Sequence, residues 1–360
     1  MLQMARVLQG IGAALLLPTS LALLNHAIAD PKRRTQSISS WAGAGALGIA
    51  LGPILGGILV EGFGWRSIFA VNLPVGLAGF WMTWRYLPPG LQSTIRALDP
   101  LGQGFAIAAL AALTFALINA GRSGPTAVAS LVGGGTFLVC VAGFVIAESA
   151  VRQPMLPLGL FGRPAFASTA VVGLLHNIGI YGMIFVLSLA FQKLRDADPL
   201  AAGLLFLPLT GALALGTRLG SKAMRTWGPA WPLVCGHLAA SLGALTLAGL
   251  GVTAPGVVIA APLLLTGLGA GTTTPAMSLS ILDSVERKQS GLASGFLNGA
   301  RQTGGAIGVA LLGALIGEPA TTEGARLAFL VAAGALALAS MVALAAGWPL
   351  RRPAESGTAN

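Results

Sequence analysis

Eleven long apolar segments dominate this sequence of 360 residues. They lie at approximately 3–24, 41–60, 67–84, 101–120, 127–147, 165–191, 200–217, 229–251, 257–282, 290–317 and 327–348. A helix needs about 20 apolar residues to cross the hydrocarbon core of a bilayer. The runs are continuous rather than alternating, which favours helices over barrel strands. The sequence therefore predicts an all-α integral membrane protein with about eleven transmembrane helices.

Composition agrees with that prediction. The chain is 55% hydrophobic and 9% charged, whereas a soluble domain carries about 25% charged residues. An ordinary soluble enzyme, a disordered chain and a coiled coil are thereby excluded. The two cysteines, Cys140 and Cys235, lie inside apolar runs and are expected to be buried free thiols.

The net charge of +10 comes from Lys and Arg residues in the connecting segments. Alternate connections carry very different numbers of them, fourteen in one set and five in the other. The richer set is Lys32, Arg33, Arg34, Arg85, Arg96, Arg152, Arg163, Arg218, Lys222, Arg225, Arg287, Lys288, Arg351 and Arg352, and the poorer is Arg66, Arg122, Lys193, Arg195 and Arg326. Cytoplasmic loops carry the excess of positive charge. The bias predicts a cytoplasmic C-terminus, and scattered charges do not form a nucleic-acid-binding face.

An odd number of spans would leave Met1 outside the cell. A signal peptide ending at Ala27-Ile28-Ala29 is an alternative, but the basic run at 32–34 directly after it argues against export of that end. We therefore expect an odd number of helices to be missing upstream of this chain.

The first span contains Arg6, followed by Gln9, Gly10 and Gly12. An arginine in a membrane helix usually faces a wet interior or a polar partner, which would make Arg6 functional. An arginine near a chain end can instead extend to the membrane surface. The two glycines allow another helix to approach closely.

The second span carries a glycine stripe with a proline inside it. Gly48, Gly52 and Gly56 recur every four residues, with Pro53 and Gly57 beside them. Such a stripe is typical of helix packing in membranes, and the proline bends the helix. After a short turn comes a further motif, made of Trp65, Arg66, Phe69, Asn72, Pro74 and Gly76.

These three segments, in this order, resemble the major facilitator superfamily, in its fourteen-span drug:proton antiporter branch of EmrB/QacA-type exporters. The first matches that family's fourth-helix motif, whose arginine is implicated in proton transfer. The second matches the fifth-helix antiporter motif, and the third matches the start of the sixth helix. The resemblance implies that three N-terminal spans are missing, so that eleven of fourteen are present and the chain is N-terminally truncated.

The resemblance also implies a domain organisation. We expect a partial N-terminal half at 1–87, a two-helix central insert with cytoplasmic linkers at 88–164, a six-helix C-terminal half at 165–350, and a cytoplasmic tail at 351–360. By family analogy, the first, second, sixth, seventh, ninth and tenth spans would line the central cavity.

Polar residues inside two other spans are candidate substrate contacts. Asn298, Arg301 and Gln302 lie within one helical turn and could share a face toward a central cavity; alternatively, Arg301 bonds to carbonyls of a neighbouring helix. In the sixth span, His176, Asn177 and Tyr181 lie mid-run, although a single histidine there is more often a packing residue. No His or Cys pair has metal-ligand spacing, and we expect no metal or other cofactor.

Carboxylates lie only at span ends or in loops, with Glu61, Glu148 and Asp283 at span ends. Proton-coupled transporters commonly carry the proton on a buried acid, so proton coupling is implied here by the resemblance alone. Arg6, Gln9 and Arg301 are the candidates for it, unless Glu61 or Asp283 faces a wet cavity or the carrier lies in the missing segment.

We therefore expect a multi-pass exporter in the cytoplasmic membrane, not an enzyme. It would export small amphipathic or hydrophobic compounds such as drugs and antibiotics, by alternating access in exchange for protons. A non-functional or partner-dependent fragment and a metabolite exporter of the same fold are alternatives. An integral-membrane lipid or prenyl transferase is least favoured, because its metal site would need clustered carboxylates and Asp196-Ala197-Asp198 is the only near approach. The oligomeric state is not predicted.

Overall fold

A computed structural model describes residues 2–28, 30–86, 99–151, 158–317 and 319–346. The expected tail at 351–360 lies outside these ranges, as do Arg96, Arg152, Arg351 and Arg352 of the charge pattern. The described residues form thirteen α-helices and two short 3-10 helices, with no strand. They are α1 (Leu2–Ala27), α2 (Pro31–Phe63), α3 (Ser67–Ala70), α4 (Asn72–Tyr86), α5 (Pro100–Ser123), α6 (Val128–Ala150), η1 (Leu158–Gly162), α7 (Pro164–Lys193), α8 (Pro199–Leu205), α9 (Leu207–Trp227), α10 (Ala230–Leu250), α11 (Gly256–Asp283), η2 (Arg287–Gln289), α12 (Ser290–Ile316) and α13 (Thr322–Ala345).

The eleven predicted segments are largely helical where the structure describes them, but 67–84 is divided into α3 and α4, and 200–217 is divided between α8 and α9. By length and composition, eight helices of the described chain could cross a membrane, or nine when α8 and α9, bent by 42°, count as one span. The expected spans at 41–60 and 290–317 correspond to α2 and α12, which are less apolar than the helices counted as able to cross a membrane. Both helices are rich in glycine, and α12 also carries an arginine, an asparagine and a glutamine. These less apolar helices turn out to line the central cavity.

Loop carboxylates and threonines begin several helices. The side chains of Asp30, Asp99, Asp198 and Thr321 each accept a hydrogen bond from a backbone N–H in the first turn of α2, α5, α8 and α13. Such caps satisfy donors that have no partner inside the helix. Three of the acidic residues outside the spans therefore have a structural role.

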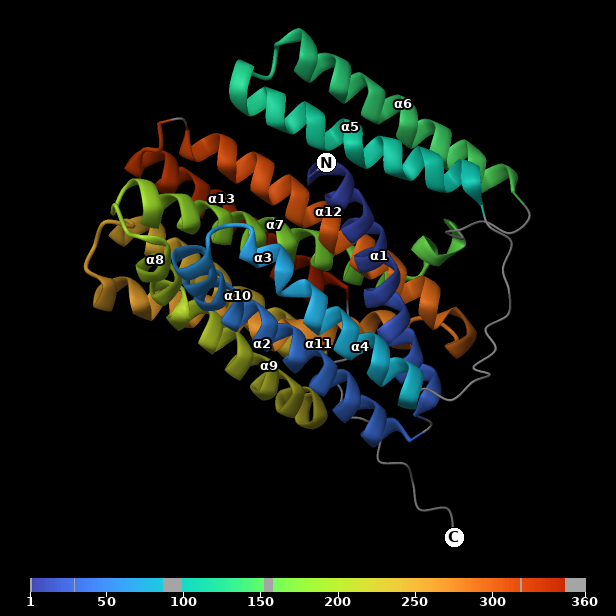
Figure 1. The fold of residues 1–360 in the computed structure, drawn as a ribbon. Coiled ribbons are helices and arrows are strands. Elements are labelled where there is room, and N and C mark those ends of the chain that lie inside the picture. Colours follow the sequence, from blue (N-terminus) through green and yellow to red (C-terminus); the bar gives the residue numbers. More distant parts are fainter. Residues whose placement is uncertain (1, 29, 87–98, 152–157, 318, 347–360) are drawn as a thin grey trace.

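The C-terminal helices α7 to α13 form a bundle against which α1, α2 and α5 pack (Figure 1). The α5–α6 hairpin lies along its outside and contacts it mainly through α12, where Gly121 of α5 approaches Ala314. Helix α2 packs on α8 and α9, and α1 packs on α12. Helices α3 and α4 contain no buried residue.

Glycines set the close spacing inside this bundle. A methyl group on Gly267 or Gly271 of α11 would collide with backbone carbonyls of α9, at Leu209 and Leu213. On α12, Gly304 likewise lies against the carbonyl of Leu174 on α7. Small residues permit this approach where no hydrophobic effect drives helices together in lipid. Glycines on α11 and α12 therefore set how closely these helices approach α9 and α7.

Two large apolar clusters occupy the two ends of the bundle, and a smaller one with Ile180 and Leu213 lies between them. One large cluster contains Leu187, Leu263 and Leu312, and the other contains Phe166, Met277 and Leu297. On α7, α11 and α12 alike, the stretch between the two clusters falls near the middle of the helix. Polar residues of these helices concentrate in that middle stretch.

Connecting segments of the same charge set lie together in the structure, as the alternating charges require. At one end, Arg34 forms an ion pair with Asp283, with 3.0 Å between nitrogen and oxygen, and Arg163 donates to the carbonyl of Ser284. At the other end, Arg195 donates to the carbonyls of Val252 and Ala254. The first group joins segments from the basic-rich set and the second joins segments from the poorer set.

Two helices extend well beyond their predicted spans, since α2 begins at Pro31 rather than at 41 and α9 continues past 217. The seventh span was expected to end at 217, but α9 continues to Trp227. Arg218, Lys222 and Arg225 therefore lie on the last turns of a helix rather than in a loop, because a strongly amphipathic helix can extend beyond its apolar part.

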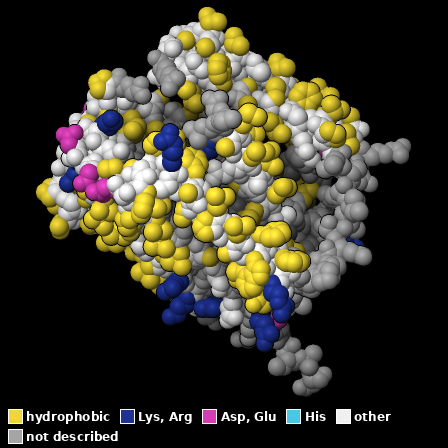
Figure 2. Space-filling view, in the orientation of Figure 1, with side chains coloured by type: hydrophobic (Ala, Val, Ile, Leu, Met, Phe, Trp, Pro, Cys, Tyr) yellow, Lys and Arg dark blue, Asp and Glu magenta, His cyan; other side chains and the backbone are white. Residues whose placement is uncertain are grey.

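Figure 2 shows hydrophobic side chains over most of the described part of one face, with basic side chains in a few separate groups.

Candidate functional site

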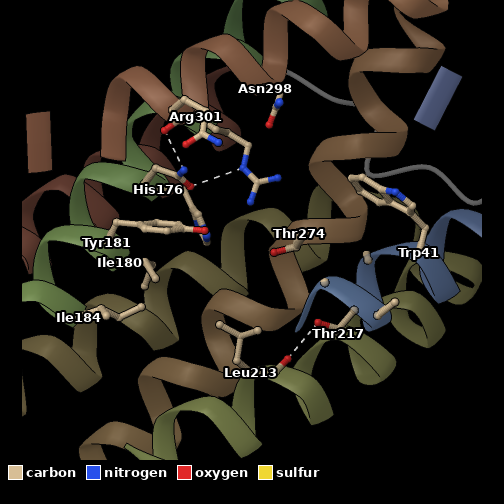
Figure 3. Close-up of a pocket in the computed structure, with 15 residues that line it drawn as sticks. Trp41, His176, Ile180, Tyr181, Ile184, Leu213, Thr217, Thr274, Asn298 and Arg301 are labelled. Atoms are coloured by element: carbon tan, nitrogen blue, oxygen red, sulfur yellow. Dashed lines mark hydrogen bonds between the residues drawn. The ribbon is translucent and has the colours of Figure 1, made fainter. Parts of the chain in front are cut away.

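A cavity of about 320 Å³ opens between the middle parts of α7, α9, α11 and α12 and the first half of α2 (Figure 3). Its lining residues are Trp41, Ala42, Ala44, Gly45, His176, Asn177, Ile180, Tyr181, Ile184, Leu213, Thr217, Thr274, Asn298, Arg301 and Gln302. The volume falls at the lower end of the range for small-molecule pockets, about 300–1,000 Å³. Five of the six spans expected around the cavity contribute to it, and α1 does not.

Helices α7 and α12 supply the polar side of the cavity. Asn177 donates its side-chain N–H to the backbone carbonyl of Arg301 at 2.7 Å. Its amide oxygen lies 3.5 Å from Nε of Arg301. Gly304, one turn further along α12, allows the two helices to approach closely enough for these contacts. One asparagine thus holds both the backbone and the side chain of the arginine.

Arg301 is the one charged residue that lines this cavity. The described residues contain two ion pairs, Arg34–Asp283 and Arg326–Glu323, and neither involves Arg301. In Figure 3 its guanidinium group extends away from α12 into the cavity. A partly buried cation without an acidic partner is costly in a membrane interior, and such residues usually mark a functional site.

Two histidines form a buried hydrogen-bonded pair behind the polar side. Nδ1 of His176 lies 3.2 Å from Nε2 of His237, and the rings meet edge to face. Nδ1 of His237 lies 2.6 Å from the carbonyl of Leu233, which can only accept a hydrogen bond. A neutral His237 therefore carries its proton on Nδ1 and accepts at Nε2 from Nδ1–H of His176. Thr273 reinforces this tautomer, since its hydroxyl donates to Ala270 and lies 3.3 Å from Nδ1 of His176.

The remaining walls are apolar or carry neutral hydroxyl groups. Ile180, Ile184 and Leu213 form one side, and Trp41 of α2 lies on the other (Figure 3). The hydroxyl of Thr217 donates to the carbonyl of Leu213, four residues earlier on its own helix. The cavity thus combines an apolar, aromatic wall with one polar side.

The structure brings together all six predicted polar candidates of the sixth and tenth spans. His176, Asn177 and Tyr181 of α7 and Asn298, Arg301 and Gln302 of α12 line the same cavity. Sequence reasoning missed Trp41, Thr217 and Thr274. Only for Trp41 was there a signal, an aromatic residue at the start of a span followed by small residues. The structure also pairs His176 with His237 of α10, behind the cavity wall.

The first-span motif lies elsewhere. Arg6 donates to the side chain of Gln9 at 3.1 Å, and its guanidinium carbon lies 4.8 Å from the ring centre of Phe69. Arg6 is exposed in the described structure and does not line the cavity. Gly10 and Gly12 have open space where a side chain would be.

The glycine stripe of α2 is also largely open. Gly48, Gly52 and Gly56 have no heavy atom of a described neighbour within 4 Å of the position a Cβ would occupy. Only Gly57 is in close contact, 3.0 Å from the carbonyl oxygen of Pro199. The expected close packing is therefore seen at Gly57 alone, while Pro53 lies inside a continuous α2.

The motif at the start of the sixth family helix forms the turn from α2 into α3 and α4. The ring of Trp65 meets Phe69 edge to face, and the guanidinium of Arg66 lies 4.7 Å from the Trp65 ring centre. Asn72 donates to the carbonyl of Ile68. Pro74 and Gly76 lie on the exposed α4. These residues stabilise a local turn and do not reach the cavity.

Comparison with known proteins places this fold and cavity in context. Residues 1–309 match the family model described as Major Facilitator Superfamily. The methylenomycin A resistance protein of Streptomyces coelicolor is 33% identical over 347 residues, which are 96% of this chain and 72% of that protein. The drug efflux pump JefA of Mycobacterium tuberculosis is 35% identical over 87% of this chain and 61% of that protein. The tetracenomycin C resistance and export protein of Streptomyces glaucescens is 31% identical over 86% of this chain and 58% of that protein.

This chain therefore spans less than two thirds of the length of the second and third of these relatives. Among solved structures, the human organic anion transporter MFSD10 (TETRAN) aligns with a TM-score of 0.44 and 13% identity, over 91% of this chain and 83% of that one.

Proposed function

Because this chain belongs to the Major Facilitator Superfamily, we propose that it exports small amphipathic or hydrophobic compounds, drugs and antibiotics among them, from the cell. The proposed mechanism is alternating access, in which two groups of helices rock about a central site. Export would be driven by exchange for protons. We assign the chain to the fourteen-span drug:proton antiporter branch and to the cytoplasmic membrane, with its C-terminus in the cytoplasm.

The observation that carries the proposal is the cavity between five long helices, at the middle of four of them. Transporters of this general kind bind their substrates near the bilayer midplane, between groups of helices. The cavity has both an apolar wall with Trp41 and a polar side with Arg301 and Asn177, which suits an amphipathic molecule. The names of the relatives given above, a drug efflux pump and antibiotic resistance proteins, support the substrate class.

Within that mechanism, we propose that His176, Asn177, Tyr181, Asn298 and Gln302 contact the substrate. Arg301 would contact the substrate and also take part in proton exchange, because it lies among these residues. Arg6 and Gln9 are hydrogen-bonded to each other on α1 and would take part in proton exchange at a separate place.

Contacts at both ends of the bundle are the candidates for alternating gates. At one end, Arg34 of α2 pairs with Asp283 of α11. At the other end, Gly57 of α2 lies against the backbone of Pro199 and Leu200. Both contacts join α2 to helices of the proposed C-terminal half, so rocking of one group against the other would open one contact and preserve the other.

The domain organisation proposed with this function follows the sequence prediction. It has a partial N-terminal half at 1–87, a two-helix insert at 88–164, a six-helix half at 165–350 and a tail at 351–360. The separate α5–α6 hairpin on the outside of the bundle supports the insert.

The test is accumulation of compounds in efflux-deficient bacterial cells that express the full chain. A panel of amphipathic fluorescent compounds with different charges should accumulate less in expressing cells, and a protonophore should abolish the difference. Arg301→Ala should restore accumulation while the protein still inserts, as judged by membrane fractionation. Unchanged accumulation across the panel would contradict drug export and leave export of metabolites as the function to test.

A further inference from the structure

We propose that the central cavity selects organic anions, compounds with a carboxylate or phenolate on an apolar body, through the guanidinium group of Arg301. This inference rests on the proposed export function for its physiological meaning, but concerns the binding site itself. The anionic group would lie beside Arg301, and the apolar body would lie against Trp41, Ile180 and Leu213.

The first argument is charge balance. Arg301 is the one charged residue among those that line the cavity, and no Asp or Glu of the described chain lines it. The described acidic residues lie at helix ends or in loops, where Asp283 pairs with Arg34 and Glu323 pairs with Arg326. A charge removed from water needs a partner of opposite sign. A bound anion would supply that partner, whereas a bound cation would add like charge in a poorly screened space.

The second argument is the set of hydrogen-bond donors left for a ligand. Asn177 faces Nε of Arg301, which holds the guanidinium plane in one orientation. No described protein group is hydrogen-bonded to the two terminal nitrogens of Arg301, and these nitrogens form the fork that binds a carboxylate through two parallel hydrogen bonds. In Figure 3 the fork points into the space bordered by Asn298, Thr274 and Tyr181. These neutral groups could donate to an anion without competing for the arginine.

The third argument concerns the rest of the ligand. Away from the arginine, the lining includes isoleucine and leucine side chains on one side and a tryptophan on the other. An inorganic anion such as phosphate would leave this surface without a partner. An aromatic or aliphatic carboxylate would bury it, and burial of apolar area is the main favourable contribution for such ligands. The cavity therefore fits an amphipathic organic anion better than a free inorganic ion.

The experiment measures binding of three compounds that share one ring system. Purified full chain in detergent is dialysed to equilibrium at neutral pH against 1-naphthoate, 1-naphthamide or 1-naphthylmethylammonium, which are anionic, neutral and cationic. We expect naphthoate to bind at least about tenfold more tightly than naphthamide, the scale of one charge-assisted hydrogen-bonded contact, and the cation to bind most weakly. Excess inorganic phosphate should compete poorly. Failure of naphthoate to bind more tightly than naphthamide would overturn the proposal, as would displacement by phosphate at equal concentration.

Variants locate the selectivity at Arg301. Arg301→Gln should lower the affinity for naphthoate to that for naphthamide, while binding of naphthamide persists and reports a folded cavity. Arg301→Lys should retain a reduced preference for the anion. Arg326→Gln, which removes an exposed arginine at the start of α13, is the matched control and should change neither affinity. An undiminished anion preference in Arg301→Gln would also overturn the proposal, and the wild-type series decides the question even if this variant fails to fold.

The outcome separates this inference from the proposed function. Anion-selective binding without export of any compound from cells would contradict the export function and leave the site assignment intact. Export that is equally efficient for anions and cations, with no difference in binding, would contradict the site assignment and leave the export function intact.

Discussion

The side chain of Asn177 on α7 contacts Arg301 on α12 twice: its N–H donates to the arginine backbone carbonyl at 2.7 Å, and its oxygen lies 3.5 Å from the arginine Nε. The two residues are 124 positions apart in the chain. One neutral side chain therefore fixes the orientation of the charged group that dominates the cavity, without neutralising it. The first prediction tests this distinction between orientation and charge.

Asn177→Asp should remove the anion preference of the cavity. The substitution keeps the size of the side chain and puts a carboxylate beside Nε of Arg301, so that the guanidinium gains a partner within the protein and no longer needs a bound anion. It also removes the N–H that donates to the Arg301 carbonyl, so α7 and α12 lose one hydrogen bond. We expect the affinity for naphthoate to fall about tenfold, toward that of naphthamide. Equilibrium dialysis measures it. Asn119→Asp, at a half-buried position on α5, is the control that adds the same charge away from the cavity.

His237→Ala should destabilise the protein. The substitution leaves the carbonyl of Leu233 and Nδ1 of His176 without one partner each, and it empties a fully buried site. Loss of buried hydrogen bonds together with a cavity costs about 2–4 kcal/mol. Thermal unfolding in detergent should show a clearly lower midpoint. Leu238→Ala, on the exposed face of the same helix, should lower it much less; equal shifts would argue against a structural role for the pair.

Gly304→Ala should separate α7 from α12. A methyl group at this position collides with the backbone carbonyl of Leu174, which cannot move away as a flexible side chain could. Overpacking of this kind costs about 1–3 kcal/mol. Because Arg301 lies less than one turn away, naphthoate binding should weaken as well. Gly299→Ala is the matched control on the same helix, since its position is open, and it should be neutral or slightly stabilising.

The ion pair between Arg34 and Asp283 should contribute measurable coupling. Arg34→Asp and Asp283→Arg should each destabilise the protein, and the double variant should recover part of the loss by restoring opposite charges. We expect a coupling free energy of about 0.5–1 kcal/mol, because the Asp283 side chain is half exposed and therefore well solvated. The same cycle on Arg326 and Glu323, which are both exposed, should give almost none. A double variant no more stable than the sum of the single changes would show that the pair does not join α2 to α11.

Reporter fusions should locate the C-terminus in the cytoplasm. The excess of Lys and Arg in alternate connections orients helices with those connections inside. A green fluorescent protein fused after Asn360 should therefore fluoresce, and alkaline phosphatase at the same place should be inactive. The opposite pattern would reverse the assignment for the whole bundle.

Sequence alone determined that this protein consists of helices, and that most of them are apolar enough to lie in a membrane. Apolar runs of membrane length are a local property, and so are the charges between them, the glycine stripes and the polar residues of 176–181 and 298–302. The sequence also limited which residues could share a helix face, because side chains three or four positions apart lie together. Those regularities were sufficient to predict the fold class and the six polar candidates on α7 and α12.

The tertiary structure decided which of those faces meet. It paired His176 with His237, turned Trp41 toward the cavity and kept Arg6 away from it, against Phe69. Helical periodicity shows which residues share a face of one helix, but not which other helix packs against that face. Residues on different helices are brought together only by packing. That packing depends on close backbone contacts such as Gly304 against Leu174, which involve atoms that every residue has and that no sequence pattern distinguishes.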